Sequence, residues 1–238
     1  MAKKLAGAPE TGGFEDGDRQ PPVMTLVAFD FDGTLSDSEM TVLLGEQCGA
    51  ADEMDAITRR AMNDEIPYAR SLRERCRLLE GLPRERAEAA FGRVELRPGA
   101  PAVIEALNRA GHTTAILTGG FERGVERALE AEGVLVDTIV SNRLPMADGA
   151  LTGAVEGPLI EGTKDDALVK LAGTQNVPMG ETVAVGDGAN DLPMLEVAGL
   201  AIGFAPKPRV EPACDVVVDT MTELREVLVE EGVLPAEG

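Results

Sequence analysis

The sequence predicts an α/β fold, a three-layer Rossmann-like core around a parallel sheet, with a small helical cap inserted after the first strand. Three observations lead to this prediction. Apolar strand segments alternate with helical segments from residue 98 onward, polar or glycine-rich turns follow several strands, and residues 37–93 show helical spacing without a strand signal. Because neighbouring parallel strands need crossover connections, the alternation predicts a sheet with helices on both faces.

The expected domain boundaries follow from composition and periodicity. Residues 1–22 are rich in glycine, proline and charge and predict a disordered tail, which leaves Met1 and Met24 as alternative start sites. Residues 23–36 and 94–238 are assigned to the core, and residues 37–93 to the cap.

The elements can be placed in order along the chain. The first strand is expected at residues 25–31, and the last cap helix at residues 84–93. Further helices are expected at residues 99–110, 121–132 and 164–173, directly after residue 191, and at residues 222–231. Further strands are expected at residues 113–117, 136–140, 182–185, 201–203 and 216–218, and Asp148-Gly149 predicts a hairpin turn within residues 143–155.

Composition restricts the partners and the compartment. A formal net charge of −20 argues against nucleic acid and anionic membrane surfaces. No apolar run approaches the roughly 20 residues of a membrane-spanning helix, and the three cysteines lack metal-binding spacing, which favours a cytoplasmic protein with small buried thiols. The composition is compatible with a monomer or a homodimer.

The basic residues are unusual as well, because only five of the 22 are lysines. An acid-rich, lysine-poor surface suits a solvent of high ionic strength, where screening weakens the repulsion between like charges. We therefore expect a salt-adapted protein, with an ordinary acidic protein as the alternative.

Two carboxylates follow the first predicted strand. Asp30 and Asp32 are two residues apart, so the alternation of strand side chains predicts that they point the same way. Gly33 then allows a sharp turn. In open α/β sheets ligands bind at the carboxyl ends of strands, which makes this pair a candidate site for catalysis or cation binding. For an Asp-x-Asp taken alone, a polar turn is the alternative.

Three further segments carry suitable groups at strand ends or helix starts: residues 118–120 (Thr-Gly-Gly), Lys164, and residues 186–191 (Gly-Asp-Gly-Ala-Asn-Asp). Carboxylates, a cation, a hydroxyl and backbone amides together suit magnesium and phosphate. Taken alone, these segments would be a plain turn, a solvated lysine and a weak dinucleotide fingerprint in which Asp191 replaces the last glycine. His112, the only histidine, is expected to be structural.

The motifs in this order resemble the haloacid dehalogenase superfamily of phosphohydrolases. The resemblance rests on Asp-Phe-Asp-Gly-Thr-Leu at residues 30–35 together with residues 186–191, and it covers the chain from Thr25 to the C-terminal helix. It implies that Asp30 is the nucleophile and Asp32 the general acid and base. Mg²⁺ would be held by Asp30, the backbone carbonyl of Asp32, and Asp187.

The same resemblance assigns the residues around the metal. Asp191 would support the metal ligands, and Thr118, Gly119 and Lys164 would bind phosphate. Asn190 would contact the phosphate or Lys164. Thr118 stands where serine is commoner in the superfamily, and both residues offer a hydroxyl group.

Within the superfamily the chain is similar to the enzymes that act on phosphoserine, in which residues of the cap recognise the substrate. The resemblance implies that Glu39 binds the amino group, that Arg75 binds the carboxylate, and that Met62 and Tyr68 line the pocket. Tyr68 stands where phenylalanine is frequent. A zwitterion needs an anion and a cation facing it, and arginine suits a carboxylate.

The expected function is therefore magnesium-dependent hydrolysis of O-phospho-L-serine, the last step of serine biosynthesis. Three alternatives stay open. Glu39 and Arg75 can belong to solvated helix faces, the substrate can be phosphohomoserine or a sugar or glycerate phosphate, and, less favoured, the protein can bind phosphate as a regulator without turnover. The sequence leaves open whether phosphate is also transferred to serine.

Overall fold

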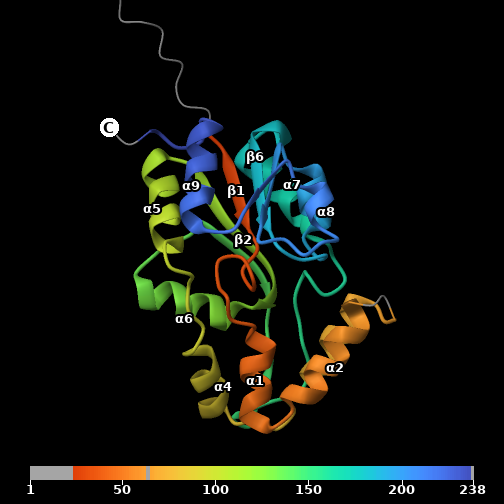
Figure 1. Ribbon diagram of the computed structural model, residues 1–238. Helices are drawn as coiled ribbons and strands as arrows, with labels where there is room; N and C mark the ends of the chain where they lie inside the picture. The colour runs from red at the N-terminus through yellow and green to blue at the C-terminus, as the bar shows by residue number, and fades with distance from the viewer. Residues whose placement is uncertain (1–23, 63–64, 237–238) are drawn as a thin grey trace, which may run out of the picture.

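A computed structural model describes residues 24–62 and 65–236 (Figure 1), so the predicted tail at residues 1–22 lies outside the described residues. The core is a six-stranded sheet with the order β3-β2-β1-β6-β7-β8, and every neighbouring pair is parallel. The strands are β1 (Leu26–Phe29), β2 (Thr113–Phe121), β3 (Thr138–Asn142), β6 (Thr182–Gly186), β7 (Leu200–Phe204) and β8 (Val216–Val218). The predicted α/β core is confirmed.

Helices cover both faces of this sheet (Figure 1). The pleat of β1 divides its side chains, with Val27 and Phe29 in one apolar cluster and Leu26 and Ala28 in the other. The first cluster includes side chains of α5 (Ala100–Ala110), α6 (Glu122–Glu132) and α9 (Met221–Glu230), and the second those of α7 (Lys164–Gln175) and α8 (Leu192–Val197). Among the described helices, none combines the length and hydropathy needed to span a membrane.

The helices between β1 and α5 lie beyond one end of the sheet and form the cap (Figure 1). They are α1 (Met40–Cys48), α2 (Ala51–Met62), α3 (Tyr68–Arg77) and α4 (Arg84–Phe91). Apolar side chains of the cap, including Met40, Leu44 and Leu72, belong to the same cluster as one face of β1. The cap therefore shares part of its core with the α/β unit, and its last helix ends before the predicted Arg93.

A short hairpin from a distant part of the chain packs on the cap. Its strands are β4 (Met146–Ala147) and β5 (Ala150–Leu151), and the turn residues Asp148 and Gly149 have φ values of 49° and 81°. Two positive φ values are typical of the type I′ hairpin turn that the Asp-Gly pair predicts. The Gly81 amide donates to the Leu151 carbonyl, and the Leu151 amide donates to the Leu82 carbonyl, both at 2.9 Å. The cap is thus built from two segments of the chain.

Strand pairing shifts two of the predicted boundaries. The strand predicted at residues 113–117 continues as β2 to Phe121, with a register shift against β3 between Leu117 and Phe121. Residues 118–120 are therefore an irregular strand end, and the predicted end of the strand at residue 117 is wrong. β3 begins at Thr138, later than predicted, because Thr138 pairs with Ala115 and Asn142 pairs with Phe121.

The single histidine has a structural position. Buried His112 accepts a hydrogen bond at Nδ1 from the Thr25 amide at 3.2 Å, and its Nε2 lies 2.5 Å from the Val233 carbonyl oxygen. Thr25 directly precedes β1, so His112 lies at the amino end of the sheet, away from Asp30. The structural role predicted for it is confirmed.

The cysteines differ in burial. Cys76 is buried within the cap, Cys214 is partly buried, and Cys48 is exposed at the end of α1. The expectation that all three thiols are buried is therefore wrong for Cys48.

Candidate active site

Asp30 and Asp32 lie at the carboxyl end of the central strand. β1 ends at Phe29, and the Asp30 amide still donates to the Val185 carbonyl at 2.9 Å, which fixes Asp30 against β6. Asp30 is 2% exposed, and Asp32 follows on a turn with a buried Oδ1 that has no hydrogen-bond partner. The side chains of Asp30 and Asp32 line the same cavity, as predicted. Because β1 ends at Phe29, the turn after the strand places them there, and not the alternation of strand side chains.

Lys164 joins two carboxylates inside the core. Its Nζ lies 2.5 Å from Oδ1 of Asp30 and 2.5 Å from Oδ1 of Asp191. Lys164 is the first residue of α7 and is 3% exposed. The alternative of a solvated lysine at this helix start is therefore wrong. A buried ammonium group requires such partners because desolvation penalises its charged form.

The loop after β6 folds back on Asp191. Oδ2 of this carboxylate accepts hydrogen bonds from the Asp187 amide at 3.0 Å and from the Gly188 amide at 2.9 Å. A Cβ at Gly186 would lie 2.6 Å from Asp191, so only glycine allows this close approach. Asp191 therefore fixes the loop that carries Asp187.

Asp187 faces the cavity from this loop and has a partner that the motifs did not reveal. Nζ of Lys207 lies 3.0 Å from Oδ2 of Asp187. A Cβ at Gly33, where φ is 92°, would lie 2.7 Å from the same oxygen, so the first motif packs directly on the last. Lys207 follows β7, and the rule that sites form at strand ends was the only signal that could have indicated it.

The irregular end of β2 forms another wall of the cavity. The Gly120 amide donates to Oγ1 of Thr118 at 2.9 Å, and a Cβ at Gly120 would lie 2.8 Å from Oδ2 of Asp32. Nδ2 of Asn142 donates to the Gly119 carbonyl at 3.0 Å, which fixes the strand end from β3. Thr118 and Gly119 thus lie beside the acids, as predicted, but they belong to a strand and not to a helix start.

The cap contributes a buried arginine. Arg75 on α3 is 8% exposed, and its Nη1 donates to Oγ1 of Thr41 on α1 at 3.1 Å. Its Nε is buried without a hydrogen-bond partner. A guanidinium group in this state is available for an anion because it has already lost much of its hydration. The alternative of a solvated helix face is therefore wrong for Arg75.

Glu39 and Tyr68 line the cavity from two different parts of the cap segment. Glu39 precedes α1, and its side chain is exposed but lines the cavity, close enough to Lys207, Asp187 and Arg75 for their charges to shift its pKa. Tyr68 begins α3 and is 37% exposed, but its hydroxyl end lies inside, where a Cβ at Gly119 would be 1.9 Å from the hydroxyl oxygen. The tyrosine hydroxyl therefore contacts the strand end that was expected to bind phosphate.

Asn190 and Met62 are the remaining predicted site residues. Asn190 is exposed and lines the cavity, and its Oδ1 lies near Gly188. Met62 is the last residue of α2, and its side chain lies outside the described part of the structure. The cavity itself has a volume of about 800 Å³ and is lined by both the core and the cap.

The electrostatics follow from burial and crowding of the acids. Burial, with Asp191 nearby, raises the pKa of Asp30 to about 7 in spite of Lys164. Burial raises the pKa of Asp32 well above its usual value, and Glu39 and Asp30 add to this rise. Burial also raises the pKa of Glu39, which Lys207 and Arg75 oppose. The carboxyl groups of Asp30 and Asp32 therefore hold a proton more readily than a solvated aspartate.

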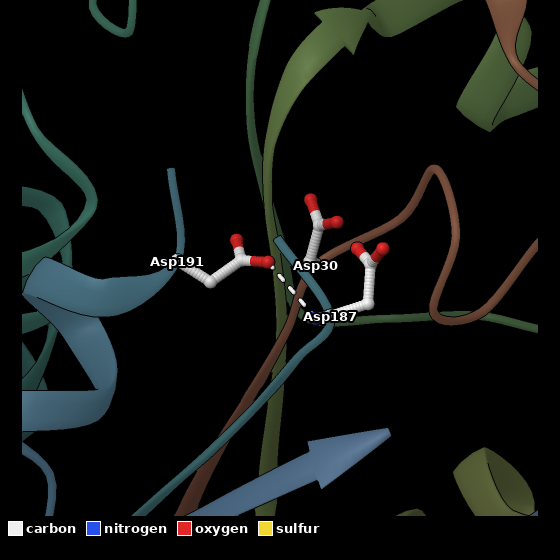
Figure 2. Close-up of side chains that lie close together, drawn as sticks. All are labelled: Asp30, Asp187 and Asp191. Carbon is white, nitrogen blue, oxygen red and sulfur yellow. Dashed lines mark hydrogen bonds between the residues drawn. The ribbon is translucent and has the colours of Figure 1, made fainter. Parts of the chain in front are cut away.

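Figure 2 shows Asp30, Asp187 and Asp191 around one point, with oxygen atoms that lie within 4.8 Å of one another. All three residues are buried. When all three are ionised, these carboxylates outnumber the ammonium groups of Lys164 and Lys207, which leaves an excess of negative charge. Hard oxygen ligands with unbalanced negative charge fit a divalent cation.

Comparison with known proteins identifies the class. Residues 27–196 match the family of haloacid dehalogenase-like hydrolases, and the chain belongs to this family. It is similar to phosphoserine phosphatase of Halobacterium salinarum, with 52% identity over 210 residues, 88% of this chain and 100% of the relative. Phosphoserine phosphatase of Methanocaldococcus jannaschii is 38% identical over 204 residues, 85% of this chain and 95% of the relative.

Solved structures give the same result. A phospho-aspartyl intermediate analogue of phosphoserine phosphatase matches with a TM-score of 0.80 and 37% identity, covering 87% of this chain and 99% of that one. A substrate-bound phosphoserine phosphatase complex matches with a TM-score of 0.80 and 36% identity, covering 87% and 98%. The resemblance inferred from the motifs is confirmed.

Proposed function

We propose that this protein hydrolyses O-phospho-L-serine to L-serine and phosphate, the last step of serine biosynthesis, through an aspartyl-phosphate on Asp30. The observation that carries the proposal is one cavity in which Asp30 and Asp32 face the buried Arg75 of the cap. Relatives that match over nearly the whole chain are phosphoserine phosphatases, which supports this substrate.

In the first half of the reaction Asp30 is the nucleophile. One of its oxygens forms a bond to phosphorus while the bond from phosphorus to the serine oxygen breaks. Lys164 contacts Oδ1 of Asp30, which leaves Oδ2 for this attack. Asp32 gives its proton to the departing serine oxygen, and its raised pKa favours the protonated form that this step needs.

In the second half of the reaction, a water molecule displaces Asp30 from the phosphorus atom. Asp32, now a carboxylate, takes a proton from water as the water oxygen bonds to phosphorus. The bond between phosphorus and Asp30 breaks, which restores both carboxyl groups and releases phosphate. Thr118, Gly119 and Lys164 bind the phosphate oxygens, and Asn190 approaches them from the rim of the cavity.

The divalent cation of the site is Mg²⁺ in this proposal. Asp30, the backbone carbonyl of Asp32, and Asp187 would hold it, with Asp191 fixing the loop of Asp187. When bound, Mg²⁺ would supply positive charge to the phosphate oxygens during transfer.

The cap recognises the serine part of the substrate. The carboxylate of the substrate pairs with Arg75, whose Nε has no partner of its own, and the ammonium group pairs with Glu39. Tyr68 lines the remaining wall, and the family resemblance implies the same role for Met62. These roles require the cap to close over the substrate, which excludes water from the first half-reaction.

Phosphate release from a panel of phosphomonoesters tests the function. The panel holds phosphoserine, phosphohomoserine, a sugar phosphate and a glycerate phosphate, each with Mg²⁺ and beside an Asp30→Asn control. We expect a strong preference for phosphoserine that the control abolishes. Equal release from all four would contradict the substrate, and no release at all would support a phosphate-binding protein without turnover.

Three variants test the substrate contacts. Arg75→Ala and Glu39→Gln should each raise KM for phosphoserine at least tenfold, because each leaves one charge of the zwitterion unpaired. Arg77→Ala, an exposed arginine on the same helix, is the matched control and should leave KM unchanged. If Arg75→Ala and Glu39→Gln hydrolyse phosphoserine like the unchanged protein, the amino-acid assignment is wrong.

A further inference from the structure

Lys207 is a second lysine of the cavity, and neither the motifs nor the roles above use it. Its side chain is 48% exposed, whereas that of its partner Asp187 is 11% exposed. Both residues line the cavity. The half-exposed ammonium group of Lys207 therefore lies between the proposed metal ligand and the open side of the cavity.

The backbone presents this lysine in a fixed position. Lys207 stands between Pro206 and Pro208, which restrict the local backbone. Ala205 has a φ value of 40°, in the left-handed region that alanine rarely adopts. The Lys207 amide donates to the Asp187 carbonyl at 2.9 Å, so the same residue contacts Asp187 through both its backbone and its side chain.

The three clustered carboxylates are held from two sides. Lys164 contacts Asp30 and Asp191 from within the core. Asp187 is instead contacted by Lys207 at its Oδ2 from the open side. Because Lys207 holds Oδ2, the carboxylate of Asp187 has a defined orientation. The position of its other oxygen, Oδ1, is thereby set as well.

We infer that Lys207 is a positioning residue of the metal site, which orients Asp187 so that the carboxylate binds Mg²⁺. The inference rests on the metal use in the proposed function. Groups that orient metal ligands commonly contribute ten- to a hundredfold to metal affinity. A lysine that only balanced charge would have the opposite effect, because its removal would strengthen the attraction of the acids for the cation.

Calorimetric titration of the whole protein with Mg²⁺ in the absence of substrate tests this inference. We expect Lys207→Met to weaken magnesium binding about tenfold or more. Lys207→Arg keeps the charge and should stay within about threefold of the unchanged protein. Lys170→Met, the same replacement at an exposed lysine of α7, is the matched control and should have no effect.

Unchanged or tighter magnesium binding by Lys207→Met would overturn the inference, and so would a failure of the unchanged protein to bind Mg²⁺. Circular dichroism checks the fold, and Lys207→Gln replaces the methionine variant if that variant does not fold. The titration needs no turnover. A wrong substrate would therefore show as absent phosphoserine hydrolysis with intact metal binding, and a wrong role for Lys207 as intact metal binding in the variant.

Discussion

Lys164 places its ammonium group 2.5 Å from Oδ1 of Asp30, and each side chain is only 3% exposed. The same ammonium group contacts Asp191, so one buried cation pairs with two buried carboxyl groups. Ions in this environment depend on each other, because each has lost its hydration. Removing one of these partners would therefore leave buried charge without compensation, which destabilises the folded state.

Lys164→Met tests how far the buried carboxyl groups depend on this cation. Without a cation, Asp30 and Asp191 remain buried and unpaired, and we expect the metal-free protein to lose about 3 kcal/mol or more of unfolding free energy. Magnesium should restore part of this loss, because it supplies positive charge to the same acids. Urea unfolding with a chelator and with Mg²⁺ measures both. Lys170→Met is the control, and an equal loss in that exposed position would contradict the explanation.

Tyr68 and Gly119 should behave as a coupled pair. A Cβ at Gly119 would lie 1.9 Å from the tyrosine hydroxyl oxygen and 3.0 Å from the ring carbon that carries it. Gly119→Ala should therefore push the cap away from the strand end that is proposed to bind phosphate, and lower the rate of phosphate release about tenfold or more.

Tyr68→Phe in the Gly119→Ala background removes the closest of these contacts and should restore several-fold of the lost rate. A double-mutant cycle of phosphate-release rates measures the coupling. Strictly additive effects of the two substitutions would mean that the tyrosine hydroxyl does not limit the space at Gly119.

The raised pKa of Asp30, about 7 against a usual 3.8, predicts how the metal-free protein responds to pH. Between these values the folded protein keeps a proton on Asp30 that the unfolded chain releases. The free energy of unfolding should therefore fall as pH rises from about 5 to 7, by up to about 1.4 kcal/mol per unit, and then level off.

Chemical unfolding in a chelator at several pH values tests this sign. Asp30→Asn has no carboxyl group to titrate at this position, so its slope between pH 5 and 7 should be less negative. Saturating Mg²⁺ should also reduce the slope, because the cation favours the ionised carboxylate. A slope of Asp30→Asn equal to that of the unchanged protein would contradict the assignment to this group.

The net charge of −20 predicts a dependence of stability on salt. Screening should weaken the repulsion among acidic side chains, so the Tm should rise between about 0.1 M and molar KCl. A series of thermal melts in KCl, with Mg²⁺ held constant, measures this. A Tm that stays level or falls would favour an ordinary acidic protein, since exposed pairs such as Arg59–Asp55 are themselves weakened by salt.

The sequence by itself determined the parallel core and most of the acidic cluster at its edge. An apolar strand followed by Asp30, and another followed by residues 186–191, are local patterns, and parallel strands bring such ends to one edge of the sheet. The Asp148-Gly149 turn was likewise predictable, because its positive φ values depend on the residues of the turn itself.

Only the tertiary structure decided what depends on contacts between distant segments. Pairing with β3 extends β2 through residues 118–120, and the hairpin at residues 146–151 joins the cap through hydrogen bonds to residues 81 and 82. The contact of Lys207 with Asp187 follows from the arrangement of β6 beside β7. No periodicity or motif encodes such a contact, because its energy arises only when the two strand ends lie side by side.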